Sequence, residues 1–83
     1  MTRDEVTAVV IDELGRIAPE IGAKQLNPDA DLREEFDLDS MDFLNLVTAL
    51  GERLKFDIPE TDYPHLATLS ETVAYLAQKL GAA

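Results

Sequence analysis

The sequence contains no cysteine. The chain therefore has no disulfide framework and no thiol of its own, a composition that suits a reducing cytoplasm. No apolar run reaches the roughly 18 residues that a membrane-spanning helix needs. The N-terminal stretch carries acids where a signal peptide would carry basic residues. We therefore expect a cytoplasmic protein without stable membrane insertion.

Basic residues are also scarce. There are 7 of them against 17 acidic residues, which gives a net charge of −10. This charge repels nucleic-acid phosphates and anionic lipid, and it attracts basic protein surfaces. We expect protein partners and no nucleic acid, and we expect a monomer because like charges repel.

The chain has 83 residues, of which 46% are apolar and 29% are charged. This is the composition of a folded globular domain and not of a disordered tail. The length predicts a single domain over residues 1–83 with one modest core. Such a core leaves little room for a deep catalytic cleft, so an elaborate enzyme is disfavoured.

Helical spacing of apolar residues marks three segments. The first should end between Leu14 and Ala18, before Pro19. The second runs from Ser40 to Leu54, and the third follows the capping-box spacing of "TLSE" and ends at Gly81. In the first helix the apolar residues are Val6, Val9, Val10, Leu14 and Ile17, and the polar face carries Asp4, Glu5, Asp12 and Glu13.

The rest of the chain is less regular. Residues 19–39 read as a long loop with one helical turn near Asp31–Glu35, and Pro64 keeps any helix over Glu60–Leu66 short. No alternating strand pattern occurs. The sequence thus predicts an all-α fold, a small four-helix bundle with three longer helices, a short third helix and a long first loop. Four apolar residues should pin this loop to the core: Leu26, Leu32, Phe36 and Leu38.

Ser40 stands among acids at the start of the second long helix. Either Asp39 or Ser40 could be the N-cap, and Asp42 places a carboxylate in the first turn. The free N–H groups and the positive dipole end of such a helix also favour a phosphate ester on the hydroxyl. The local pattern therefore permits both a simple cap and an attachment point.

Two other kinds of chemistry fit poorly. A serine hydrolase needs a base beside its nucleophile, but the only histidine, His65, lies next to Pro64 and reads as a surface turn residue. Seven acids lie between Asp29 and Asp42, yet no register places glycine and glutamate where a calcium-binding loop requires them. The acids form either a solvated face or a docking surface.

The stretch "DLDSMDFLNLVTALGERLKFDIPE", residues 37–60, resembles the core of the acyl carrier protein family. In that family an Asp-Ser pair begins the second helix of a four-helix bundle. The resemblance covers nearly the whole chain, because the first helix, the long loop and the closing "ATLSETVAYL" follow in the family's order.

The resemblance implies that Ser40, next to Asp39, carries 4'-phosphopantetheine as a covalent cofactor. A phosphopantetheinyl transferase would attach it from coenzyme A, and its terminal thiol would hold acyl groups as thioesters. The protein itself would catalyse nothing. Its partners would be acyl-transferring or acyl-modifying enzymes with basic docking patches, in fatty-acid, polyketide or related specialised lipid biosynthesis. The implied partner-binding residues are Met41, Asp42, Leu44, Glu52 and Asp57.

Three departures from the common family pattern favour a specialised carrier. Asp37 stands where many members have glycine, Asn45 and Gly51 replace frequent glutamates, and the first loop is long. Two alternatives stay open at this point. One is an aminoacyl or peptidyl carrier, and the other is an unmodified acidic helical module that only binds partners.

Overall fold

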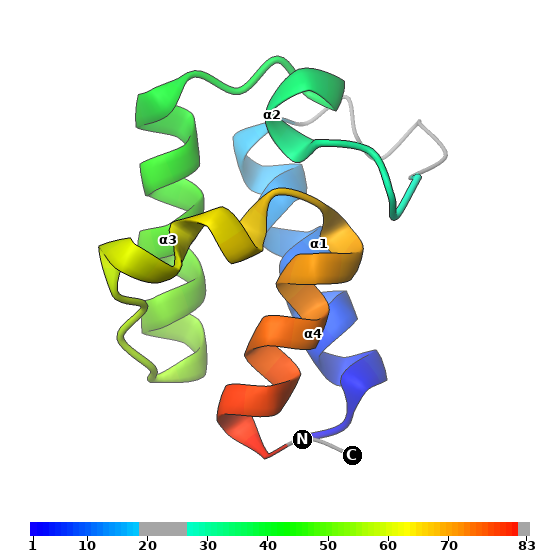
Figure 1. Cartoon of the computed structure of the whole chain (residues 1–83), viewed down its shortest axis with the longest axis vertical. Helices are drawn as coiled ribbons and strands as arrows, with labels where there is room; N and C mark the ends of the chain where they lie inside the picture. Colours follow the sequence, from blue (N-terminus) through cyan, green and yellow to red (C-terminus); the bar gives the residue numbers. More distant parts are fainter. Residues whose placement is uncertain (19–26, 82–83) are drawn as a thin grey trace.

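The computed structural model describes residues 1–18 and 27–81. Three long helices, α1 (Arg3–Ile17), α3 (Ser40–Leu54) and α4 (Leu69–Leu80), form the body of the molecule. A single turn, α2 (Leu32–Glu35), precedes α3, and the 3-10 helix η2 (Glu60–Leu66) leads from α3 to α4 (Figure 1). The described residues contain no strand. The predicted bundle, with three longer helices and a short third one, is confirmed.

The helix α1 begins at a reciprocal cap that was not predicted, although "TRDE" has the required spacing. The N–H of Glu5 donates to the Thr2 hydroxyl at 3.2 Å, and the N–H of Thr2 donates to the Glu5 carboxylate at 3.0 Å. The helix ends at Ile17, inside the predicted window. None of the helices in the described part of the chain is long and apolar enough to cross a bilayer.

The core lies where α1 packs against α3 and α4, and where η2 packs against α4. Phe43, Leu46, Val47, Leu50 and Leu54 recur at helical spacing and are predicted to form one apolar stripe on α3. Phe43 is partly buried at the edge of the core, and the rest of the stripe is buried. In the first loop Leu32, Phe36 and Leu38 are buried as predicted, whereas Leu26 lies outside the described residues. The buried members of the α3 stripe are Leu46, Val47, Leu50 and Leu54.

The predicted polar face of α1 is not exposed throughout, because Glu13 is only 5% exposed. Arg53 on α3 donates to the Glu13 carboxylate at 3.1 Å and also to Asp12. A buried carboxylate is tolerable when it is paired and hydrogen-bonded. The pattern of one helix cannot reveal such a partner on another helix.

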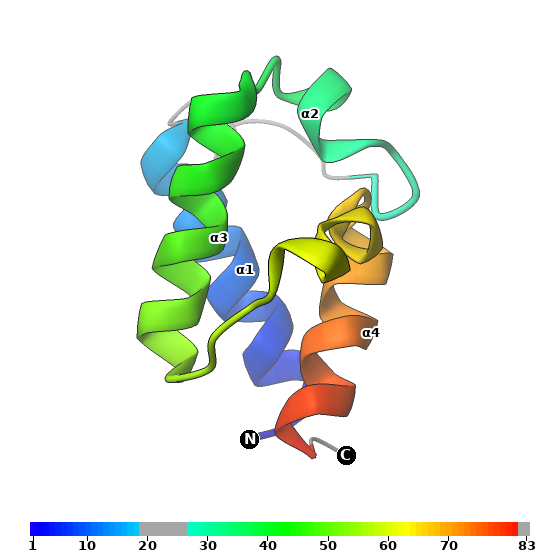
Figure 2. The same cartoon turned by 60° about the vertical axis from the view of Figure 1, so that its left-hand side comes forward.

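Backbone hydrogen bonds attach the first loop to the start of α4. The N–H of Leu32 donates to the Ala67 carbonyl at 2.8 Å, and the N–H of Ser70 donates to the Pro28 carbonyl at 2.9 Å. The Asp31 side chain caps α2, which forms the expected helical turn. The loop thus holds α2 at the end of the molecule where α3 begins (Figure 2).

The joint between α2 and α3 is a Schellman-type ending. The N–H of Leu38 donates to the Arg33 carbonyl at 2.9 Å, and the residue between them in the turn, Asp37, has a left-handed φ of 52°. This is the position at which helices commonly place glycine. The turn ties the α2 backbone directly to the start of α3.

The other helix ends follow similar rules. Lys55 ends α3 with a φ of 55°, and Gly81 ends α4 with a φ of 67°. At the start of α4 the N–H of Glu71 donates to the Thr68 hydroxyl at 3.0 Å, which is one half of the predicted capping box.

Candidate functional site

Ser40 is the first residue of α3, and its side chain is exposed. The N-cap is Asp39, whose carboxylate accepts the N–H of Asp42 at 2.8 Å. The choice that the sequence left open is therefore settled in favour of Asp39. Since another residue performs the capping, the Ser40 hydroxyl is not needed to start the helix.

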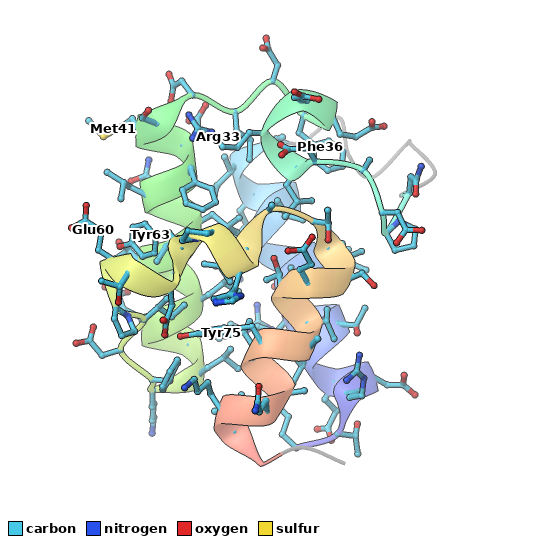
Figure 3. All side chains as sticks on the ribbon, viewed as in Figure 1. Arg33, Phe36, Met41, Glu60, Tyr63 and Tyr75 are labelled. Carbon is cyan, nitrogen blue, oxygen red and sulfur yellow. The ribbon has the colours of Figure 1, made fainter. Side chains whose placement is uncertain are left out.

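Arg33 approaches the Ser40 hydroxyl from α2. Its Nη2 donates to Ser40 Oγ at 3.3 Å, and its guanidinium carbon lies 5.6 Å from the centroid of the Phe43 ring. Figure 3 shows this side chain between α2 and the first turn of α3. Sequence reasoning missed this contact. The only available signal was that Arg33 is the single base among seven acids.

A groove of about 510 Å³ opens beside Ser40. The rings of Phe43 and Tyr63 meet there edge to face, with centroids 5.8 Å apart. The groove thus combines a hydroxyl, a guanidinium and aromatic walls. Its lining residues are Asp31, Arg33, Ser40, Phe43, Leu44, Glu60, Tyr63, Pro64 and Ala67.

Members of the family commonly hold the acyl chain between the helices, and eight apolar residues of this sequence could line such a space. All eight are buried in the core, and none lines the groove at Ser40. Their first role is therefore to form the core of the bundle. They are Phe36, Leu46, Val47, Leu50, Leu54, Ile58, Leu66 and Val73.

The residues predicted to bind partners follow one another along α3 and just beyond it. Met41 is 67% exposed and Leu44 is 44% exposed. Glu52 and Asp57 are exposed, and Asp42 is half-buried. The structure therefore places apolar and acidic groups on accessible parts of α3, and their role in binding stays a prediction.

His65 is exposed, as predicted, but it lies within η2 and stacks on Tyr75, with ring centroids 6.0 Å apart. The Tyr75 hydroxyl donates to Asp62 at 2.5 Å. Burial, and next the bond to Asp62, raise the pKa of Tyr75 to about 12.

The side-chain contact of Ser40 is with Arg33, and a guanidinium cannot act as the base of a hydrolase.

Comparison with known proteins extends over nearly the whole chain. A family model described as "Phosphopantetheine attachment site" matches residues 4–76. The acyl carrier protein of Chlamydia caviae is 27% identical over 78 residues, covering 94% of this chain and 95% of that protein. The acyl carrier protein of Helicobacter hepaticus is 31% identical over 75 residues, covering 90% of this chain and 92% of that protein.

A solved structure agrees with these relatives. The solution structure of a provisionally assigned acyl carrier protein from Anaplasma phagocytophilum has a TM-score of 0.87 and 28% sequence identity. The comparison covers 100% of this chain and 97% of that one. The family match, the named relatives and the shared fold lead to one conclusion. The chain belongs to the acyl carrier protein family, whose members carry acyl groups on phosphopantetheine.

Proposed function

We propose that Ser40 is the residue that carries 4'-phosphopantetheine, and that the protein delivers acyl thioesters to other enzymes without catalysing a reaction itself. The observation that supports this most directly is the division of labour at the start of α3. Asp39 caps the helix, while the neighbouring Ser40 hydroxyl is exposed. The hydroxyl can therefore be esterified without loss of the helix cap.

The attachment reaction needs a separate phosphopantetheinyl transferase. The Ser40 oxygen attacks the pyrophosphate of coenzyme A at the phosphorus that bears pantetheine. A phosphodiester forms, the P–O bond to the nucleotide breaks, and adenosine 3',5'-bisphosphate leaves while the hydroxyl proton is removed. The cofactor supplies a thiol, which this cysteine-free sequence lacks.

The residues around Ser40 suit a phosphodiester. The first-turn N–H groups and the dipole of α3 stabilise an anion by up to about 1 kcal/mol at an exposed site. The groove beside Ser40 gives the arm a partly apolar surface formed by Phe43, Leu44 and Tyr63. The chain thus offers a nucleophilic oxygen, the positive end of a helix dipole and space in one place.

The partner surface that we propose is the accessible part of α3 and the segment after it. Met41 and Leu44 would provide apolar contacts, and Asp42, Glu52 and Asp57 would meet basic residues of acyl-transferring or acyl-modifying enzymes. Rim charges mainly speed the encounter and set its orientation, so this binding should weaken as salt increases. A cytoplasmic location, a monomeric state and a role in lipid biosynthesis remain parts of the same proposal.

Intact-mass measurement tests the attachment residue. The protein is co-expressed with a broad-specificity phosphopantetheinyl transferase, and the expected result is the mass of one added phosphopantetheine. Ser40→Ala should abolish the addition. Ser70→Ala, which changes an exposed serine on α4, is the matched control and should keep it. A wild-type protein that stays unmodified would contradict the proposal and favour the unmodified interaction module.

A further inference from the structure

We propose that Arg33 is a phosphate-binding residue, whose guanidinium holds the phosphodiester once phosphopantetheine is attached. This inference rests on the proposed attachment at Ser40. Arg33 Nη2 already lies 3.3 Å from Ser40 Oγ, the atom that would become the ester oxygen. The phosphorus of that ester would be one bond away, so its charged oxygens fall within reach of the same guanidinium.

The position of Arg33 is fixed from several directions. Its backbone N–H donates to Asp31 at 2.9 Å, and its carbonyl accepts the N–H of Leu38 at 2.9 Å. Its guanidinium carbon lies 5.6 Å from the centroid of the Phe43 ring, within the range of a cation–π interaction. The backbone of Arg33 is thus anchored in α2, and its guanidinium lies against Ser40 and Phe43 of α3.

The surroundings of Arg33 in the sequence are strongly acidic. It is the only base among the seven acids between Asp29 and Asp42. A phosphodiester on Ser40 would add another negative charge to this surface, and repulsion between like charges would oppose an ordered arm. Arg33 is the cation placed to offset that charge.

The ion pairs of the described residues leave Arg33 available for this role. They join Arg16 and Arg53 to Asp12 and Glu13, at the interface of α1 and α3. A guanidinium also presents planar, paired donors that match two phosphate oxygens, which an ammonium group cannot do. Replacement of Arg33 by lysine should therefore retain only part of the interaction.

The test compares melting temperatures of apo and holo forms, with attachment verified by intact mass. The quantity of interest is the holo-minus-apo difference. The melting temperature of the holo form minus that of the apo form should be higher in wild type than in Arg33→Gln, by about 4 °C or more for a domain of this size. Arg33→Lys should be intermediate. Arg16→Gln, which removes an exposed arginine on α1, is the control and should match wild type.

A merely structural role for Arg33 would change apo and holo forms equally, so equal differences in wild type and Arg33→Gln would overturn the inference. Salt provides a second arm on the wild-type protein alone. Pairing with Arg33 predicts that added salt makes the holo-minus-apo difference less favourable. If added salt instead increased the holo-minus-apo difference in melting temperature, repulsion between the phosphodiester and the acids would dominate, and the pairing with Arg33 would be contradicted. Failure of attachment, seen by mass, would instead refute the proposal for Ser40.

Discussion

The carbonyl oxygen of Phe56 lies 2.9 Å from the position that a β-carbon on Gly51 would occupy. A hydrogen bond fixes this close approach, because the N–H of Phe56 donates to the Gly51 carbonyl at 3.0 Å. A glycine inside a helix costs about 0.5–1 kcal/mol relative to alanine. Here the absence of a side chain lets the chain fold back closely after α3.

Gly51→Ala should therefore destabilise the protein by about 1–3 kcal/mol, because the new methyl group meets a backbone oxygen. Urea unfolding measures the change. Gly15→Ala on α1 is the matched control, since a β-carbon there meets nothing within 4 Å. That substitution should stabilise by about 0.5–1 kcal/mol. If both variants were stabilised, the contact with Phe56 would be readily relieved and the interpretation would be wrong.

Asp37 offers a second backbone test, because its φ of 52° is a conformation that glycine adopts without strain. Asp37→Gly should stabilise by up to about 1 kcal/mol, since relief of the left-handed strain slightly outweighs the flexibility that glycine adds to the unfolded chain. Glu35→Gly removes the same charge within α2 and should destabilise by about 0.5–1 kcal/mol. Equal destabilisation of both variants in urea would show that Asp37 is not strained.

The start of α3 separates capping from attachment. Asp39→Ala removes the carboxylate that accepts the N–H of Asp42, so it should cost about 0.5–2 kcal/mol. Ser40→Ala should change the free energy of unfolding of the apo protein by no more than about 0.5 kcal/mol. Thermal unfolding of both apo variants provides the comparison. A larger loss in Ser40→Ala than in Asp39→Ala would reverse the two roles.

Two leucines on α3 test the orientation of that helix. Leu50 is 1% exposed, and Leu50→Ala should destabilise by about 2–5 kcal/mol. Leu44 is 44% exposed, so the same substitution there should change stability by no more than about 0.5 kcal/mol. Urea unfolding of the pair holds the chemistry constant and varies only burial. If Leu50→Ala were nearly neutral, α3 would have to be rotated so that its apolar stripe does not face the core.

The sequence predicted the long helices because their apolar residues recur at the helical period, and the Asp39–Ser40 pair identified the candidate attachment point. It did not predict the contact of Arg33 with Ser40. That contact spans the turn between α2 and α3, in which Asp37 has a left-handed φ of 52°. Residue spacing carries no information on such a turn.

The buried carboxylate of Glu13 was missed for a related reason. Its burial is possible because Arg53, 40 residues away in sequence, donates to it. The apolar pattern of a single helix predicts that its charged residues are exposed to solvent. Interactions of this kind depend on how two helices pack, and only the folded structure shows them.

The alkaline stability of the protein should depend on Tyr75. Its ordinary pKa of 10.0 is raised to about 12 in the folded state, first by burial and then by the hydrogen bond to Asp62. The folded state therefore favours the neutral phenol. The resulting stability is fully present below about pH 10, and it is lost as the pH rises towards and through about 12.

Urea unfolding between about pH 9 and pH 12 measures this dependence, and Tyr75→Phe should remove the part due to the phenol. In a Tyr63→Phe background, which leaves Tyr75 as the remaining tyrosine, ultraviolet absorbance of tyrosinate follows its ionisation directly. The absorbance of tyrosinate should rise at a higher pH in the folded protein than in the protein unfolded in urea. Coincident titrations of the two states would mean that neither burial nor Asp62 holds the phenol neutral, and the pH dependence assigned to Tyr75 would have to arise elsewhere.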